Sequence, residues 1–545
     1  MPSLKSRIFT TVRRDKLCLW LYIMTIHPIG FSKVIIPVKL SFPIMEESIL
    51  RDKILGCFLG KNIGGTLGAP FECQTQMNDV DFFTRDPGGV PLPNDDLDLQ
   101  LLWLTLAEYY GPANLTSRRF GEAWIDVVIG PWGEYSNCRW NCLTGFMPPL
   151  SGSCDNEGLK FSNGAWIRSE IWACLCAGRP DDAIRYAWLD ASADHASEGI
   201  YAEMFTASLE ASAFCVNDLR ELLEIGLLRI PQESRLAQSI RLAMAGHDSG
   251  RPWRTVREEV VALNQDLGWF QAPANVAFMV IGLLYGEGDF GRAVCTAVNC
   301  GDDTDCTAAT AGAIMGILLG AKGIPEKWRK PVGDGIATIS LNKFSMTAEI
   351  PKTVTELTER IMLLRRQEIL RDPALEVAQE DLHSQDVAQL LWKRSCLELR
   401  FDAPTLELGV EYLAGPYLTP GKPCTVRLNI RDSVTASQTV HFRWRLPDGW
   451  QADPNGFAVG SLNFCQSSAE STIIPPENLP EDMYYLNLEM RAGIRSFPTV
   501  FAIPFRRAGS FNVPFRFTFD EQSDGTRRFT ALRNRVKELC KKISG

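Results

Sequence analysis

The chain has 545 residues, of which 45% are hydrophobic and 22% are charged, and its formal net charge is −9. This length predicts a globular protein with more than one domain, and the negative charge argues against nucleic-acid binding through a basic face. No uncharged apolar run of 18 residues occurs, so we expect no transmembrane helix and no membrane partner. The sixteen cysteines are scattered without zinc-finger spacing, which favours free thiols in a reducing, cytoplasmic compartment.

Residues 1–44 differ in character from the chain that follows. Basic residues between Lys5 and Lys16 precede a short apolar run from Leu17 to Ile26, as in a signal peptide, but no small-residue cleavage site follows. A helical pattern then starts at Met45. We therefore expect Met45 to be the initiator and residues 1–44 to be a disordered or non-native N-terminal extension, with a signal or membrane anchor as the alternative.

Residues 45–370 predict an all-α domain. Apolar residues recur at helical spacing in about thirteen segments, and Gly, Pro and Asn separate them. Gly56, Gly60, Gly64 and Gly68 form one stripe on the first segment, which would let another backbone or a ligand approach closely. The predicted helices cover residues 49–67, 98–110, 117–128, 165–177, 181–190, 198–213, 219–226, 233–245, 255–264, 274–285, 290–299, 307–320 and 352–370.

The C-terminal third changes from helical to strand-like patterns. Residues 371–400 predict a helical connector. Residues 401–515 predict a small antiparallel β-sandwich domain, because four segments alternate or are rich in β-branched residues and turn signals separate them. These segments are residues 425–430, 438–444, 484–490 and 499–503. Residues 516–545 are expected to form a tail with a basic helix whose charges face solvent. The predicted fold class is thus a multidomain chain, all-α and then β-sandwich.

Two acidic clusters each precede a hydrophobic helix. Asn94, Asp95 and Asp96 form the first cluster, and Asp303 and Asp305 lie in the second. One Asp at a helix start is usually a cap, but two such clusters in one all-α domain predict a shared binuclear cation site. Oxygen ligands without paired His or Cys suit Mg²⁺, Ca²⁺ or Mn²⁺ better than zinc.

Taken together, these motifs resemble the ADP-ribosylglycohydrolase family, which includes the dinitrogenase reductase-activating glycohydrolases. The segment from Gly56 to Glu72 resembles the family's opening Gly-rich helix and its Glu, and Asn94-Asp95-Asp96 resembles its first acidic motif. The resemblance covers roughly residues 46–345, and residues 401–505 more weakly resemble a β domain appended in some bacterial members. Four later motifs match in order, at Ser162–Arg168, Asp194-His195, Gly301–Asp305 and Ile324–Trp328.

The resemblance implies a hydrolase that cleaves the glycosidic bond between ADP-ribose and an acceptor, either a protein side chain or a small molecule. It implies two Mg²⁺ ions, with Mn²⁺ in some members. Glu72 or Asp303 would activate the attacking water, and Glu72 is the better candidate because metal-bound carboxylates are weak bases. By position, the resemblance implies substrate contacts from Asn163, Gly164, Ala165 and His195, and metal ligation by Asn94, Asp95, Asp96, Asp303, Asp305 and Cys306.

This chain departs from the family pattern at several positions. Asn94 and Leu97 replace Thr, Gly65 replaces Asp, Asp302 replaces Gly, and Cys306 replaces Thr or Ser. A thiol is a poor Mg²⁺ ligand, so Cys306 could weaken one metal, shift the metal preference or leave its position to water. Two alternatives therefore stay open: a same-fold hydrolase of another nucleoside or glycoside, and a non-catalytic ADP-ribose-binding or structural relative. The sequence indicates neither the acceptor, the target, the role of the β domain nor the oligomeric state.

Overall fold

The structure is a computed structural model. It describes residues 7–11, 19–27, 30–38, 45–130, 132–346, 348–371, 382–403, 406–432, 438–461, 466–493 and 497–511. The predicted C-terminal tail, residues 516–545 with its basic helix, lies outside these ranges. Contacts between Cα atoms divide the chain into one unit at Met1–Glu47 and a second at Ser48–Gly545.

The first unit contains a three-stranded antiparallel sheet in the order β1-β2-β3. The strands are β1 (Arg7–Thr11), β2 (Leu19–His27) and β3 (Gly30–Val38). They lie within the extension that was expected to be disordered or non-native, and that expectation stays a prediction. The expectation that the native chain starts at Met45 stays a prediction.

The second unit begins with sixteen α-helices between Glu47 and Arg371 among the described residues. All thirteen predicted helices are confirmed, although residues 165–177 divide into a short 3-10 turn and α6. The sequence pattern missed α4, α5 and α15. The helices are α1 (Glu47–Gly68), α2 (Asp95–Tyr110), α3 (Ser117–Asp126), α4 (Gly133–Leu143), α5 (Leu150–Ser153), α6 (Glu170–Leu175), α7 (Pro180–Ala191), α8 (Glu198–Ser212), α9 (Leu219–Leu228), α10 (Arg235–Asp248), α11 (Trp253–Leu263), α12 (Ala272–Tyr285), α13 (Phe290–Asn299), α14 (Thr304–Gly323), α15 (Glu326–Val332) and α16 (Val354–Arg371).

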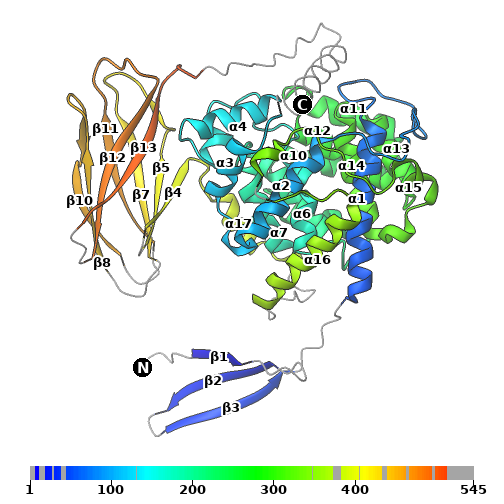
Figure 1. Cartoon of the computed structure of the whole chain (residues 1–545), viewed down its shortest axis with the longest axis horizontal. Helices are drawn as coiled ribbons and strands as arrows, with labels where there is room; N and C mark the ends of the chain where they lie inside the picture. Colours follow the sequence, from blue (N-terminus) through cyan, green and yellow to red (C-terminus); the bar gives the residue numbers. More distant parts are fainter. Residues whose placement is uncertain are drawn as a thin grey trace. The chain divides into compact units, whose positions relative to one another are not determined.

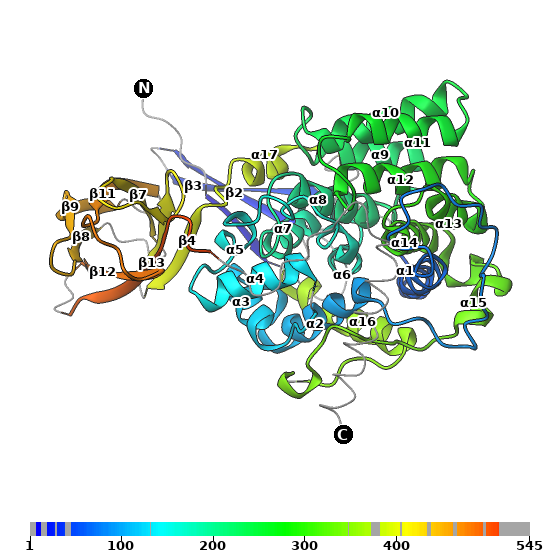
Figure 2. The same cartoon turned by 90° about the horizontal axis from the view of Figure 1, so that it is seen from above.

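Helices α1 and α14 pack with their backbones in contact, side by side in both views (Figures 1 and 2). The glycine stripe of α1 makes this possible. A Cβ atom built on Gly60 would lie 2.0 Å from the carbonyl oxygen of Gly312, and one on Gly64 would lie 1.9 Å from that of Ala308. The close approach predicted for the stripe is therefore made by another helix, and this helix carries the second acidic cluster at its start.

Helix α14 is also the one described helix that is long and apolar enough to cross a membrane. However, 89% of its apolar window is buried inside the protein. Small residues such as Ala309, Ala311 and Ala313 are wholly buried along it. Its composition therefore reflects its place in the core of the helical domain.

After α17 (Asp386–Trp392), which lies in the predicted connector, the chain forms two five-stranded sheets. Their orders are β10-β8-β12-β13-β6 and β4-β5-β7-β11-β9, and Figure 2 shows them as two layers. In β8, Val440, Phe442 and Trp444 are buried and their neighbours are exposed, as a sandwich requires. The strands are β4 (Glu398–Ala403), β5 (Leu406–Tyr412), β6 (Tyr417–Leu418), β7 (Cys424–Asp432), β8 (Gln438–Arg445), β9 (Gln451–Asp453), β10 (Gly456–Ser461), β11 (Gln466–Ile474), β12 (Met483–Ala492) and β13 (Thr499–Arg507). The predicted sandwich is confirmed.

The sandwich contacts the helical domain at the segment that contains α4 and α5. Arg506 on β13 is 3% exposed. It donates to Asn141 Oδ1 at 3.0 Å and to Thr144 Oγ1 at 2.8 Å, and it forms an ion pair with Asp155. Phe146 belongs to the hydrophobic core of the sandwich. The end of α4 is thus held by the β domain, while the start of α4 lies at the cavity described below.

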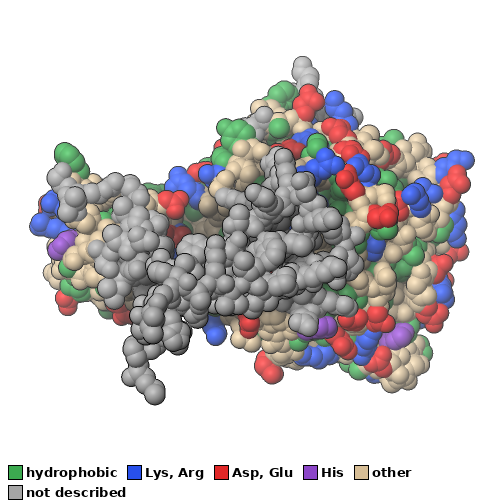
Figure 3. All heavy atoms as spheres, turned by 90° about the horizontal axis from the view of Figure 1, so that it is seen from below, with side chains coloured by type: hydrophobic (Ala, Val, Ile, Leu, Met, Phe, Trp, Pro, Cys, Tyr) green, Lys and Arg blue, Asp and Glu red, His purple; other side chains and the backbone are tan. Residues whose placement is uncertain are grey.

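Charges of both signs are spread over the described surface. In the view of Figure 3, Lys and Arg side chains lie among Asp and Glu side chains over the described part of that face. Exposed ion pairs such as Arg220 with Asp248 link neighbouring helices. On that part of the face, positive side chains do not gather into one large patch.

Candidate active site

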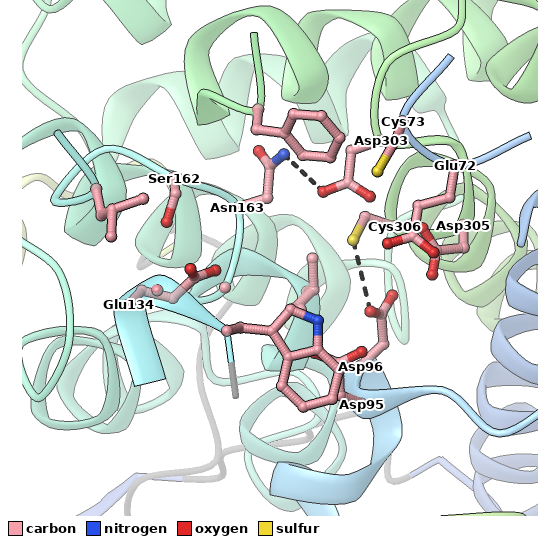
Figure 4. Close-up of a pocket in the computed structure, with 16 residues that line it drawn as sticks. Glu72, Cys73, Asp95, Asp96, Glu134, Ser162, Asn163, Asp303, Asp305 and Cys306 are labelled. Atoms are coloured by element: carbon pink, nitrogen blue, oxygen red, sulfur yellow. Dashed lines mark hydrogen bonds between the residues drawn. The ribbon is translucent and has the colours of Figure 1, made fainter. Parts of the chain in front are cut away.

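One cavity in the helical domain brings together segments that are far apart in the sequence (Figure 4). The empty space of the cavity, together with the solvent at its mouth, takes about 750 Å³. Six of its lining residues are acidic, and two are cysteines. The lining residues are Glu72, Cys73, Asp95, Asp96, Trp132, Gly133, Glu134, Leu159, Ser162, Asn163, Gly164, Ile167, Phe270, Asp303, Asp305 and Cys306.

The second acidic cluster lies at the start of α14, opposite the end of α1. Glu72, Asp303 and Asp305 each offer an oxygen atom within 4.8 Å of the others. Asp303 is held from two sides. Its Oδ2 accepts a hydrogen bond from Asn163 Nδ2 at 2.7 Å, and its backbone N–H donates to Asn275 Oδ1 at 3.2 Å. This group consists of oxygen ligands alone, which suits a hard cation.

The first acidic cluster forms the first turn of α2 and faces the same space. Asp95 Oδ2 accepts from the hydroxyl of Tyr135 at 3.1 Å. The thiol of Cys306 donates to Asp96 Oδ1 at 3.5 Å. Asp96, Asp305 and Cys306 make a second group whose ligand atoms lie within 4.8 Å of one another. The two groups share Asp305, as the ligands of a binuclear site would.

Asn94 lies beside this cluster and caps α2. Its Oδ1 accepts from the backbone N–H of Asp96 at 2.7 Å, a usual N-cap contact. A Cβ atom on Gly65 would lie 2.5 Å from Asn94 Nδ2. Asn94 thus fills the space above Gly65. It is not one of the cavity-lining residues among those described, and its role as a metal ligand stays a prediction.

The carboxylates of both clusters are buried next to one another. Burial raises the pKa of Asp303 and of Asp96 well above the usual range, and the neighbouring Asp305 raises both further. Burial also raises the pKa of Asp95 to about 7. Asp96 Oδ2 and Asp305 Oδ1 are buried without a hydrogen-bond partner. Buried carboxylate oxygens without hydrogen bonds are suited to bind a divalent cation. The cation would lower the pKa values of these carboxyl groups and would contact the oxygens that have no hydrogen bond.

A buried lysine supplies one positive charge near the first cluster. Lys61 Nζ lies 2.7 Å from Glu170 Oε1 and 2.6 Å from the carbonyl oxygen of Ile167, but 3.9 Å from Asp96 Oδ2. Its closest pairing is therefore with Glu170. One lysine does not balance the five carboxylates of the two clusters and Glu72. Lys61 was not predicted, although a lysine within a Gly-rich apolar helix was the signal that could have found it.

The predicted substrate-binding residues occupy two depths. Asn163 and Gly164 line the cavity. Ala165 and His195 are wholly buried. His195 lies behind the lining: its Nε2 is 3.0 Å from Ser162 Oγ, and its Nδ1 is 2.8 Å from Asp194 Oδ1. His195 can therefore act on a ligand through Ser162, and direct contact stays a prediction.

Asp194 is also paired with Arg168, and this pairing fixes the floor of the cavity. Arg168 Nη2 lies 2.6 Å from Asp194 Oδ1, and Arg168 also hydrogen-bonds the carbonyl oxygen of Gly164. Burial would raise the pKa of Asp194, but Arg168 and His195 outweigh burial and lower it to about 2. Asp194 is thus ionised at neutral pH and holds both neighbours in place.

Asp302 is wholly buried and is not one of the residues that line the cavity. Its backbone φ of +69° is one that glycine adopts easily, and this is the position where the family usually has Gly. Its carboxylate accepts from the Phe270 N–H at 3.1 Å and from Asn275 Nδ2 at 2.8 Å. Burial raises its pKa to about 6. The charge expected near the site is thus used to hold the start of α12.

Several cavity residues were missed in the sequence. Trp132 and Glu134 enter from the start of α4, which was not predicted. Phe270 enters from a loop with a backbone φ of +62°, and strained non-glycine residues often mark functional sites. Burial raises the pKa of Glu134. In Figure 4, Glu134 lies across the cavity from Glu72 and Asp305, so the cavity carries carboxylates on two walls.

Comparison with known proteins adds a family assignment to this geometry. The sequence profile of the ADP-ribosylglycohydrolase family matches residues 46–368. The chain belongs to the ADP-ribosylglycohydrolase family. The matched range contains the helical domain with all sixteen cavity residues, and it ends before the sandwich.

A solved structure described as an ADP-ribosylglycohydrolase-related protein complex is also similar to this chain. The similarity covers 59% of this chain and 99% of that one, with 20% sequence identity and a TM-score of 0.40. No curated protein sequence matches the chain.

Proposed function

We propose that this ADP-ribosylglycohydrolase family member is a metal-dependent hydrolase. Its substrate would be ADP-ribose joined through C1″ to an acceptor, which is a protein side chain or a small molecule. The reaction replaces the N- or O-glycosidic bond by a bond to water, and it releases ADP-ribose and the free acceptor. Two divalent cations complete the site, and the one in the oxygen-ligand group is Mg²⁺ or Mn²⁺.

One observation carries the proposal. Acidic residues from four separate segments of the matched domain converge on one cavity, and buried oxygens of Asp96 and Asp305 have no hydrogen-bond partner there. Structural caps would have satisfied these oxygens with backbone N–H groups. A site that needs a cation and faces a cavity lined by further carboxylates is the arrangement that this hydrolysis requires.

The residues divide the chemical work between them. Bound cations would orient the ribose hydroxyls and stabilise developing negative charge. Glu72, at the cavity just beyond α1, would take the proton of the attacking water. Asn163 holds the Asp303 carboxylate in place through its 2.7 Å hydrogen bond. Ser162, set by His195 behind it, offers a hydroxyl to the substrate.

The test is a product assay on a panel of ADP-ribosylated acceptors, with arginine-linked and serine-linked forms included. Each is incubated with the wild-type chain in Mg²⁺, in Mn²⁺ and in excess chelator, and free ADP-ribose is quantified. We expect release from at least one acceptor, only with a divalent cation. The D303N variant should release none, because it loses a carboxylate of the site.

A second candidate is a same-fold hydrolase that acts on another nucleoside or glycoside. It is favoured by the charge of the cavity: among the described lining residues none is Lys or Arg, and Glu134 adds a further carboxylate. Such a wall offers no side-chain cation to a diphosphate. Cleavage of a nucleoside without release of ADP-ribose from any acceptor would select this candidate. A chain that binds ADP-ribose but cleaves nothing would be the non-catalytic relative.

A further inference from the structure

We propose that the two halves of the metal site take cations of different classes. The group formed by Asp96, Asp305 and Cys306 takes a thiophilic divalent cation such as Zn²⁺ or Co²⁺. In the neighbouring oxygen-only group, Asp303 and Asp305 hold a hard cation such as Mg²⁺, and Glu72 lies beside it as the base. This inference rests on the binuclear site of the proposed function, and it replaces the expectation of two Mg²⁺ ions with a mixed pair.

The position of the sulfur atom carries the first step. Cys306 lies in the first turn of α14, and its Sγ is 3.5 Å from Asp96 Oδ1. Sγ and one oxygen from each of Asp96 and Asp305 lie within 4.8 Å of one another. Cys306 is only 6% exposed. The sulfur thus stands among the ligand atoms themselves, and the buried position favours a direct sulfur ligand over a bridging water.

The second step rests on the oxygen atoms around it. Asp96 Oδ2 and Asp305 Oδ1 are buried without a hydrogen-bond partner, and Asp96 and Asp305 are 1% and 4% exposed. Both residues belong to the sulfur-containing group. Lys61 Nζ lies 3.9 Å from Asp96 Oδ2, which is beyond hydrogen-bond distance. A buried carboxylate oxygen without a hydrogen bond is costly, and a cation held between the two carboxylates and the sulfur would remove that cost. The group is therefore a ligand set rather than a packing contact of one cysteine.

The third step is the chemistry of the donors. Thiolate ligands favour Zn²⁺ and other soft or borderline cations, whereas carboxylate and water ligands suit Mg²⁺ and Mn²⁺. A bound metal also deprotonates a coordinating thiol. Mg²⁺ gains little from such a sulfur, because it prefers oxygen ligands in near-octahedral geometry. The all-oxygen group beside it keeps the preference for a hard cation.

The cavity provides its own control thiol. Cys73 also lines the cavity, next to Glu72, but it belongs to neither group of ligand atoms. A thiol that merely lies in an acidic cavity and a thiol that ligates the metal can therefore be compared within the same chain. The matched variants are C306S and C73S, with C306T as the change toward the residue that the family usually carries.

The experiment uses the full chain freed of metal by chelation and then loaded with Co²⁺. A thiolate bound to Co²⁺ gives an intense ultraviolet charge-transfer absorption that oxygen ligands do not give. We expect this absorption in the wild type and in C73S, and its loss in C306S and C306T. We also expect C306T to lower Zn²⁺ affinity by more than about tenfold, the least that losing even an outer-shell partner costs, and to raise Mg²⁺ affinity.

The wild-type spectrum decides the matter even if a variant fails to fold. No thiolate absorption in Co²⁺-loaded wild type, or an absorption that persists in C306S and disappears in C73S, would overturn the proposal. ADP-ribose release is assayed on the same preparations. Release of ADP-ribose without any thiolate-bound metal would reject the mixed pair and keep the proposed function. A thiolate-bound metal without release of ADP-ribose would support the mixed pair and reject the proposed function.

Discussion

Substituting Gly60 by Ala tests whether the contact between α1 and α14 positions the acidic site. The new Cβ atom would lie 2.0 Å from the carbonyl oxygen of Gly312, whereas ordinary contact begins at 3.4 Å. The obstacle is backbone, so no side chain can turn aside, and the helices must separate by roughly 1.4 Å at this point. Overpacking of this kind costs about 1–3 kcal/mol, and the better helix propensity of Ala returns about 1 kcal/mol.

The difference between these two effects predicts that G60A lowers the free energy of unfolding by about 1–2 kcal/mol, measured by urea denaturation. The start of α14 would move relative to α2, so divalent-cation affinity should fall as well, and a misplacement of about 1 Å can lower activity by about a hundredfold. Gly158 is the control, because a Cβ atom there meets nothing within 4 Å. If G60A keeps both the stability and the metal affinity of the wild type, the helix contact does not position the site.

Three further predictions follow from the site and its supports. E72Q should lower the rate of ADP-ribose release by a hundredfold or more, as loss of a general base does, and should lower metal affinity less than D303N does. An equal loss of metal affinity in both variants would mean that Glu72 is a metal ligand only. Arg506→Met should destabilise the protein by about 3 kcal/mol, because it leaves Asp155 unpaired, whereas the control Arg507→Met removes an exposed pair with Asp482 and should change stability by less than about 1 kcal/mol. Similar urea midpoints for both variants would mean that Arg506 does not anchor the sandwich. The pKa of Asp194 is lowered from 3.8 to about 2, which stabilises the folded state by about 2 kcal/mol above pH 3.8, and this contribution is lost as the pH falls through 2. The difference in unfolding free energy between wild type and D194N should therefore shrink from pH 6 to pH 3, and a constant difference would contradict the pairing of Asp194 with Arg168 and His195.

The helical pattern was predicted closely because most helices bury one apolar face. The periodicity that marks α3 or α11 in the sequence is the same burial that holds these helices in the fold. Helices α5 and α15 escaped prediction because they have only 4 and 7 residues, whereas α4, with 11 residues, buries polar Asn141 and two cysteines instead of a clear apolar face. Strand β5 (Leu406–Tyr412) was not singled out although its sequence alternates, because its Gly and two Glu residues are depleted in strands.

The acidic site was predicted from residue types and their order, but its surroundings were not. Asp95, Asp96, Asp303, Asp305 and Glu72 all line one cavity, as the clusters indicated. Glu134 and Phe270 come from a helix start and a strained loop, whose positions depend on tertiary packing rather than on local sequence. His195 was expected to contact the ligand, but it lies behind Ser162. How deeply a residue lies behind a cavity wall depends on tertiary packing, which the sequence pattern does not show.

The central claim is that the converging carboxylates form a cation-dependent hydrolytic site for ADP-ribosyl bonds. The most direct measurement is the amount of free ADP-ribose that the wild-type chain releases from the acceptor panel, with Mg²⁺ or Mn²⁺ and with excess chelator. The proposal predicts release from at least one acceptor that stops when the chelator removes the cations and that D303N lacks. A wild-type chain that binds its cations yet releases ADP-ribose from none of the acceptors would contradict it.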